Sequence, residues 1–229
     1  MLKKIRKTRK YLSYYLAFSK SKIILSAGMP RSGSTWLYNA ARLIMLHSKL
    51  TSNTFSCGWI RDLDFPPQVD IMLIKVHNLP QFVAKKADLI LYSYRDIRDA
   101  LASSKRKSGK EPSMDRARYL IELDTKWRKL SDFTMRYETM IKNPNDIIER
   151  LASILEVKDI DSEYIVNEIN KLSYDSPGQK KNEYNMVNLL HQKHITDGRH
   201  KSWNSDVDAS LVKEIEKEYH YWFEKYNYL

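Results

Sequence analysis

Short apolar runs alternate with helical patterns along most of the chain. An apolar run over 23–28 leads into a turn rich in glycine, proline and serine, and residues 34–47 then carry apolar side chains at helical spacing. The runs 71–74 and 88–94 are typical of buried strands in a parallel sheet, and 133–137 is a fourth strand candidate. Strands that alternate with helices predict a three-layer α/β/α domain with a mainly parallel central sheet.

The second half of the chain carries longer helical patterns. Helices are predicted over 113–130, over 144–155 and, to close the chain, over 206–226. The polar segments 48–70 and 172–205 contain glycine and proline, and predict irregular connections.

Composition and charge narrow the class of protein. The chain has 229 residues, 42% of them apolar, which suffices for one domain with a sizeable core. We expect a basic N-terminal segment over 1–20 and a single domain over 21–229. The only cysteine, Cys57, cannot form an internal disulfide. The formal net charge of +11 is compatible with an anionic ligand, a nucleic acid or an anionic membrane as partner, and does not distinguish between them.

The N-terminus is strongly basic. Six of the first ten residues are lysine or arginine, and an aromatic stretch over 11–18 follows. The segment is too short to span a bilayer and lacks a clear cleavage site for a signal peptide. We therefore expect a cytoplasmic protein whose N-terminal helix packs a few tyrosines on the domain, with weak contact to an anionic membrane as the less favoured alternative.

Polar side chains follow the predicted strands, at the point where each strand ends. Arg31, Lys75 with His77, Arg95 and Tyr137 hold these positions. Because ligands of parallel α/β sheets bind beyond the carboxyl ends of the strands, these side chains should face one crevice.

The turn after the first strand has nearly the spacing of a P-loop. Gly28 is followed five residues later by Gly33-Ser34-Thr35, but Ser34 occupies the position where a P-loop has lysine. A cation stands inside the turn instead, at Arg31. Backbone N–H groups and a helix N-terminus at such a turn can bind a phosphate-sized anion.

Five segments, in order along the chain, resemble motifs of sulfotransferases that use 3′-phosphoadenosine 5′-phosphosulfate (PAPS). They are residues 28–37, the Lys75–Pro80 segment, Arg95-x3-Asp99-x3-Ser103, Arg136-Tyr137-Glu138 with Pro144, and 198–203. The resemblance implies a P-loop-NTPase-like sulfotransferase fold, PAPS as co-substrate and 3′-phosphoadenosine 5′-phosphate (PAP) as product, and no metal.

The same resemblance assigns roles to individual residues. The 5′-phosphosulfate would contact Arg31, Ser32, Gly33, Ser34 and Thr35, and the 3′-phosphate Arg95 and Ser103. Trp36 and Tyr137 would flank the adenine, with Asp99 orienting a neighbouring arginine. Gly198 matches the family's terminal grip on the 3′-phosphate, but Thr196 and Asp197 replace the usual cations there, and Arg199, Lys201 or His194 would substitute for them.

The chemical step would use three side chains. His77 is the candidate general base, because histidine titrates nearest neutral pH. Lys75 would stabilise the transferring sulfonate, and Arg31 would neutralise the leaving group in place of the family's usual lysine. The other histidines show no metal-ligand spacing with Cys57.

The acceptor is less defined. Segments 48–70, 105–118 and 172–197 should form its walls. They mix apolar and aromatic residues, such as Trp59, Phe65, Met114 and Tyr184, with many lysines and asparagines, which favours a polar or amphipathic hydroxyl or amine compound, a small molecule or a glycan. No nucleic-acid-binding signature is present. The sequence does not determine the oligomeric state.

Two other functions are compatible with the sequence. A P-loop kinase or phosphotransferase would share the fold, but Ser34 stands in place of its lysine and no apolar run ends in a clear magnesium-binding aspartate. A non-enzymatic binder of anionic polymers or membranes would explain the charge, and predicts affinity that falls steeply with salt.

Overall fold

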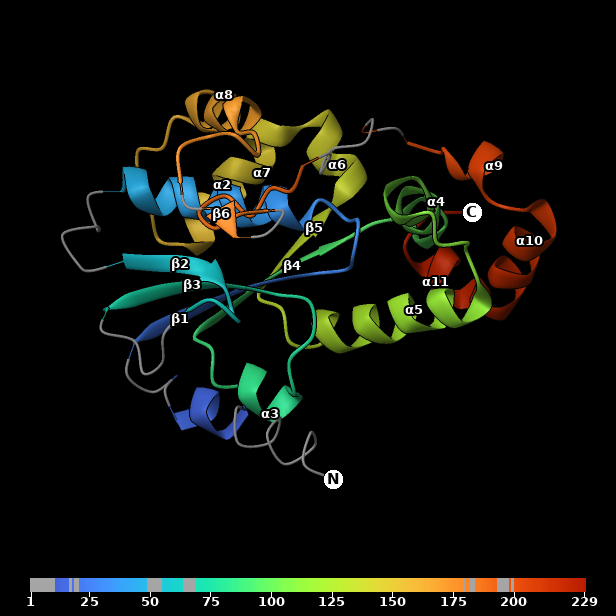
Figure 1. Ribbon diagram of the computed structural model, residues 1–229, viewed down its shortest axis with the longest axis horizontal. Helices are drawn as coiled ribbons and strands as arrows, with labels where there is room; N and C mark the ends of the chain where they lie inside the picture. The colour runs from blue at the N-terminus through green and yellow to red at the C-terminus, as the bar shows by residue number, and fades with distance from the viewer. Residues whose placement is uncertain are drawn as a thin grey trace.

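The protein is built around a fully parallel five-stranded sheet (Figure 1). The computed structural model describes residues 11–16, 18, 21–48, 55–63, 69–178, 180–181, 184–192, 198 and 200–229. The strand order is β2-β3-β1-β4-β5, and every neighbouring pair is parallel. The strands are β1 (Lys22–Gly28), β2 (Phe55–Trp59), β3 (Ile71–Val76), β4 (Leu89–Tyr94) and β5 (Phe133–Arg136). The predicted α/β class with a mainly parallel sheet is confirmed.

Strand β1 lies at the centre of the sheet and is covered on both faces. Ile24 is paired with Leu73 on one side and with Leu89 on the other. Residues 23–28 are all buried, whereas Lys22 at the start of the strand is exposed. This double burial explains why the sequence of β1 is a continuous apolar run rather than an alternation of apolar and polar residues.

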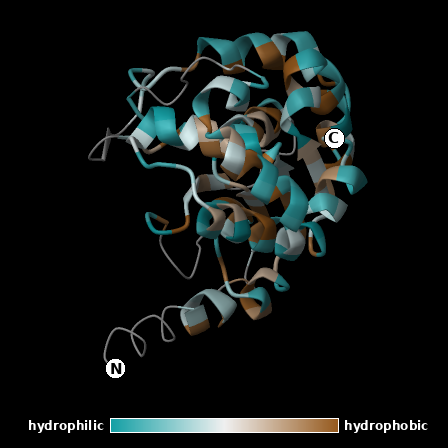
Figure 2. Ribbon diagram, turned by 90° about the vertical axis from the view of Figure 1, so that its right-hand side faces the viewer, coloured by the Kyte–Doolittle hydropathy of each residue, from teal (hydrophilic) through white to brown (hydrophobic). Residues whose placement is uncertain are grey.

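Helices form a layer on each face of the sheet (Figure 1). One layer contains α2 (Ser34–His47), α7 (Pro144–Ile154) and α8 (Ser162–Lys171), and the other contains α3 (Gln81–Ala84) and α5 (Met114–Arg128). Alternate β1 residues enter the two cores: Ile24 packs with α2, whereas Ile23 and Leu25 pack with Trp127 of α5. Figure 2 shows that hydrophobic and hydrophilic residues alternate along the helices, as expected for helices that cover a sheet with one face.

The remaining elements surround the carboxyl end of the sheet. They are α4 (Ile97–Ser108), α6 (Tyr137–Lys142), the short antiparallel pair β6 (Lys180–Lys181) and β7 (Tyr184–Asn185), α9 (Trp203–Asp206), α10 (Ala209–Glu218) and α11 (His220–Lys225). The last three helices lie beside α4 and α5 (Figure 1). No helix in the described ranges is long and apolar enough to cross a membrane.

Three sequence expectations about secondary structure are wrong. The segment 172–205, expected to be an irregular connection, contains strands β6 and β7 and the start of α9. The segment 48–70 contains strand β2, whose residues Phe55–Trp59 show no clear alternation and become a strand by pairing with β3. The single helix expected over 206–226 is interrupted at Tyr219, where φ is −114° and ψ is 27°. This break allows Trp222 and Phe223 to pack into the core near α4 and α5.

The buried carboxylate of Asp124 fixes the C-terminal helices to the sheet. It accepts hydrogen bonds from the Tyr92 hydroxyl (2.9 Å) in β4 and from Trp222 Nε1 (2.9 Å) in α11. Arg128, one helical turn further along α5, donates to the same carboxylate from Nη2 (2.7 Å) and Nε (3.1 Å). Elements far apart in the sequence therefore share one charged acceptor.

Replacing Asp124 with asparagine should lower the free energy of unfolding by about 3 kcal/mol, because Arg128 loses its buried ionic partner and one acceptor oxygen becomes an NH2 donor. Urea unfolding followed by tryptophan fluorescence measures this change. Asp115→Asn is the matched control, since its exposed pair with Arg118 (3.1 Å) contributes little. Equal losses in the two variants would contradict the anchoring role of Asp124.

Candidate active site

A cavity of about 920 Å³ lies beyond the carboxyl ends of β1, β3, β4 and β5. Many of the predicted site residues line it together: Arg31, Gly33, Ser34, Thr35, Trp36, Lys75, His77, Arg95, Ser103, Tyr137 and Gly198. The topology therefore gathers side chains from five separate sequence motifs around one space. Arg199 and its neighbours Thr196 and Asp197 lie outside the described residues.

The turn between β1 and α2 forms one wall of this cavity. Its backbone is left-handed at Arg31 (φ 69°) and at Gly33 (φ 74°), and Ser34 begins helix α2. Gly28 is needed because a Cβ atom there would lie only 2.2 Å from the Ser34 Cβ atom. The close packing presents the N-terminus of α2 to the cavity, where the helix dipole favours an anion.

Ser32 is not a cavity residue, in contrast to the expectation from its motif. Its side chain is completely buried, with Oγ 2.6 Å from the Met29 carbonyl oxygen and 2.7 Å from Ser93 Oγ. Its backbone N–H also donates to Met29 (3.2 Å). Ser32 therefore fastens the turn to β4, and the hydroxyl points away from the space where an anion would bind.

Two arginines, Arg31 of this turn and Arg95 after β4, lie close together in the cavity. Arg31 Nε donates to Ser103 Oγ (2.9 Å), which joins the first and third sequence motifs. The Arg95 guanidinium lies 4.0 Å from the centre of the Tyr137 ring and pairs with Asp99 (3.5 Å) in the first turn of α4. Stacking and pairing hold the planar arginine group in one orientation, which suits recognition of a phosphate.

His77 follows β3 and is held in a defined orientation. Its Nδ1 lies 2.9 Å from the Gly28 carbonyl oxygen, and its own carbonyl accepts a hydrogen bond from Trp127 Nε1 (3.0 Å). Because a carbonyl can only accept, Nδ1 carries the proton of the neutral ring and Nε2 keeps a lone pair. Burial, followed by the positive charge of Lys75, lowers the pKa of His77 to about 4. The imidazole is therefore neutral at pH 7 and can accept a proton.

Lys75, two residues before His77, is a buried amine that lines the cavity. Its side chain is 2% exposed, and Nζ has no hydrogen-bond partner among the residues that the structure describes. Burial holds the pKa of this amine well below its usual range. A buried polar group without a partner is costly, so an anion in the cavity would supply the missing interaction.

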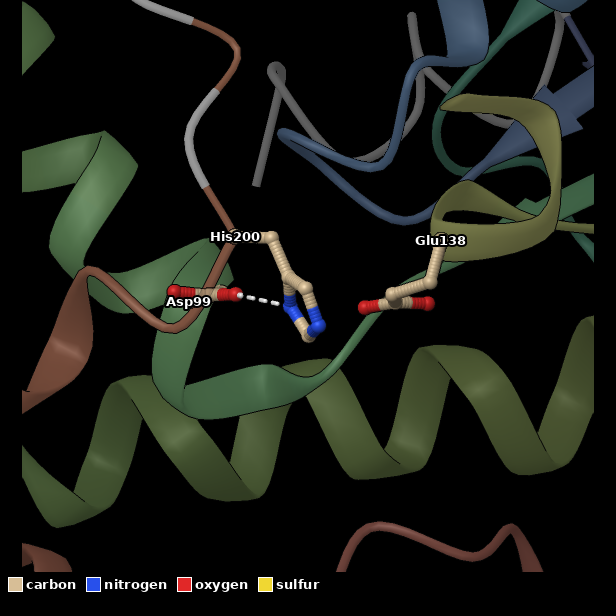
Figure 3. Close-up of side chains that lie close together, drawn as sticks. All are labelled: Asp99, Glu138 and His200. Carbon is tan, nitrogen blue, oxygen red and sulfur yellow. Dashed lines mark ion pairs between the residues drawn. The ribbon is translucent and has the colours of Figure 1, made fainter. Parts of the chain in front are cut away.

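Asp99, Glu138 and His200 form a compact cluster beside the cavity (Figure 3). The imidazole lies between the two carboxylates, with His200 Nδ1 3.7 Å from Asp99. One ligand atom from each residue lies within 4.8 Å of the others, a spacing that a metal ion could also use. The sequence could not indicate this cluster, because the three residues come from different motifs.

Protein donors already occupy both carboxylates of this cluster. Asp99 accepts hydrogen bonds from the Lys201 backbone N–H (2.9 Å) and the Ser202 hydroxyl (3.1 Å). Glu138 accepts from the Asp96 backbone N–H (3.2 Å) and the Tyr228 hydroxyl (2.9 Å). The two acids therefore anchor the C-terminal segments beside Arg95, which extends the expected role of Asp99 as a partner of an arginine.

The cavity is also lined by residues that the motifs did not identify. Val166 and Ile169 come from α8, a helix that the sequence pattern did not indicate, and Lys107 comes from the end of α4. Of the residues expected in the acceptor walls, Trp59 and Tyr184 line the cavity. Met114 packs instead against the apolar cluster around α4 and α5, and Phe65 lies outside the described residues.

Comparisons with known proteins agree with this architecture. Residues 119–227 match the model of a protein family described as the sulfotransferase domain. A sequence search of curated proteins finds no match.

Solved structures share the fold over most of the chain. Retinol dehydratase in complex with retinol and PAP is 18% identical, with a TM-score of 0.61, over 91% of this chain and 84% of that chain. A second retinol dehydratase structure, with androsterone and PAP, is 17% identical, with a TM-score of 0.60 over the same shares. A mouse sulfotransferase complexed with PAP is 16% identical, with a TM-score of 0.58, over 86% and 83%. The domain match, which covers slightly less than half of the chain, and the fold shared with these solved structures make this chain similar to the sulfotransferases.

Proposed function

We propose that this protein transfers a sulfonate group from PAPS to the hydroxyl group of a small-molecule acceptor. The observation that carries the proposal is the pair formed by neutral His77 and the buried amine of Lys75 beside an anion-binding turn. A base and a cation that face the same cavity are what sulfonate transfer to a hydroxyl requires.

The binding of PAPS would use two anion sites. The N-terminus of α2, with Ser34 and Thr35, would hold the 5′-phosphosulfate, and Arg95 with Ser103 would hold the 3′-phosphate. Trp36 and Tyr137, which line the cavity, would contact the adenine. One face of the Tyr137 ring is already covered by Arg95, so the base would meet its edge or its other face.

The proposed reaction moves one proton and exchanges two bonds at sulfur. His77 Nε2 takes the proton of the acceptor hydroxyl as the acceptor oxygen bonds to sulfur, and the bond from sulfur to the 5′-phosphate oxygen breaks. Lys75 stabilises the charge on the sulfonate, and Arg31 neutralises the departing phosphate. Because these groups are already positioned before binding, most of the rate enhancement would come from orientation and electrostatics, as in phosphoryl transfer.

Titration calorimetry with PAP tests the binding half of the proposal. Wild-type protein should bind PAP, and Arg95→Met should weaken binding by at least about 30-fold, because the 3′-phosphate loses its guanidinium. Arg136→Met is a matched control: its guanidinium also stacks on a tyrosine, Tyr228 (4.2 Å), but does not line the cavity. Absence of wild-type binding, or equal affinity in both variants, would contradict the proposed function.

A further inference from the structure

The cavity carries more positive charge than the proposed PAPS site uses. Among the described residues, five cationic side chains and a single carboxylate line it. Arg31, Lys75 and Arg95 have roles in binding PAPS. The proposed PAPS site assigns no role to Lys107 or Arg61, and both line the cavity.

Lys107 extends the cationic surface along helix α4. It follows Ser103 by four residues, so the two side chains share one face of the helix about 6 Å apart along its axis. The positive charges of Lys107 and of Arg116, in the first turn of α5, both contribute to lowering the pKa of His77. Both cations therefore lie within electrostatic range of the proposed base.

Arg61 adds a cation on the side of the cavity formed by β2. It follows β2 by two residues, and Trp59 at the end of that strand packs its ring against His77, with 5.3 Å between ring centres. The single carboxylate of the cavity among the described residues, Asp62, accepts a hydrogen bond from the Tyr184 hydroxyl (2.5 Å). Cations therefore line the cavity both along α4, at Lys107, and beside the end of β2, at Arg61.

We propose that the acceptor carries an anionic group, a carboxylate, sulfate or phosphate, in addition to the hydroxyl that receives the sulfonate. Lys107 and Arg61 would bind this group beside His77. The inference rests on the proposed function, since it concerns the acceptor of that reaction. Cations lining a partly enclosed cavity attract anions, and an anion there offsets the mutual repulsion of the cations. A bound anion would also make His77 a stronger base.

Pairs of acceptors that differ by one charge test the proposal. The first pair is 4-(hydroxymethyl)benzoate and 4-methylbenzyl alcohol, which share the same primary hydroxyl. The second pair, glucuronate and glucose, distinguishes a carbohydrate acceptor from an aromatic one. We expect the anionic member of at least one pair to have a kcat/KM at least about tenfold higher, with a preference that weakens as salt increases.

Variants of α4 locate the source of the preference. Within the preferred pair, Lys107→Ala should lower the kcat/KM of the anionic acceptor by about fivefold or more. The kcat/KM of the neutral acceptor should not change. Lys105→Ala is the matched control, because Lys105 is on the same helix, pairs with Glu111 (2.9 Å) and does not line the cavity. Arg61→Ala should act in the same direction as Lys107→Ala.

Calorimetry separates failure of this inference from failure of the proposed function. Protein saturated with PAP is titrated with 4-(hydroxymethyl)benzoate and, separately, with glucuronate, and at least one should bind more tightly than its neutral counterpart. The proposal of an anionic acceptor is wrong if PAP binds normally but the charged and neutral members of both pairs bind with equal affinity. The same conclusion follows if neither member binds. If PAP itself does not bind, the proposed function is wrong. A preference unchanged by Lys107→Ala and Arg61→Ala also overturns the inference.

Discussion

Replacing His77 with asparagine is expected to reduce sulfonate transfer by about 10²- to 10⁴-fold while PAP binding stays within about twofold of wild type. The His77→Asn protein keeps a side-chain N–H group that can donate to the Gly28 carbonyl, so the local structure is preserved. What it loses is the Nε2 lone pair. Turnover with PAPS and PAP calorimetry on the same preparation measure both quantities.

The pH dependence gives a second test of the same residue. A base is active when it is unprotonated, so activity should fall only when the pH approaches the pKa of about 4. In the free enzyme, kcat/KM should therefore stay nearly constant from pH 8 down to about pH 5. His47→Asn is the control, because His47 packs against Tyr164 outside the cavity. Near-normal turnover by His77→Asn would exclude His77 as the base.

Lys75→Met should change activity and stability in opposite directions. The amine is buried without a hydrogen-bond partner among the described residues, so an apolar side chain of similar length should raise the free energy of unfolding by about 1–3 kcal/mol. Transfer should fall by about 10²-fold or more, because the sulfonate loses the stabilising amine of Lys75. Urea unfolding and PAPS turnover measure the two effects.

The stability difference between wild type and Lys75→Met should also depend on pH. Burial lowers the pKa of Lys75 in the folded protein from 10.5, so the unfolded chain binds more protons below that value. The free energy of unfolding of the wild type should therefore rise as pH increases toward 10.5. The stability advantage of Lys75→Met over the wild type should shrink over the same range. Lys22→Met, at an exposed residue paired with Glu156 (3.1 Å), should show no such trend. A destabilised Lys75→Met protein would show that the amine is satisfied in the folded state.

Much of the fold could be read from local patterns. Helix α2 spans Ser34–His47, as its apolar spacing predicted, and the continuous apolar runs became the parallel strands β1, β3 and β4. These patterns are local consequences of burial: a central strand covered on two faces must be apolar throughout. Because ligands bind at the carboxyl ends of such strands, the positions of Arg31, Lys75, His77 and Arg95 along the chain were enough to predict that they share one cavity.

The direction of each side chain was decided only by the tertiary structure. Ser32 and Ser34 stand two residues apart in one motif, yet the first points into the protein toward β4 and the second lines the cavity. Strand β2 exists because β3 offers it an edge, and Asp99 anchors Lys201 from more than a hundred residues away.

By itself, therefore, the sequence determined the class of fold, the strands β1, β3, β4 and β5 of the sheet, and the motifs that meet in the cavity. The three-dimensional packing decided which atoms face the cavity, which carboxylates are already occupied, and that Lys75 lacks a partner among the described residues. The physical reason is that strand and helix periodicity is encoded over a few neighbouring residues, whereas burial and hydrogen bonding depend on contacts between segments that are distant in the chain.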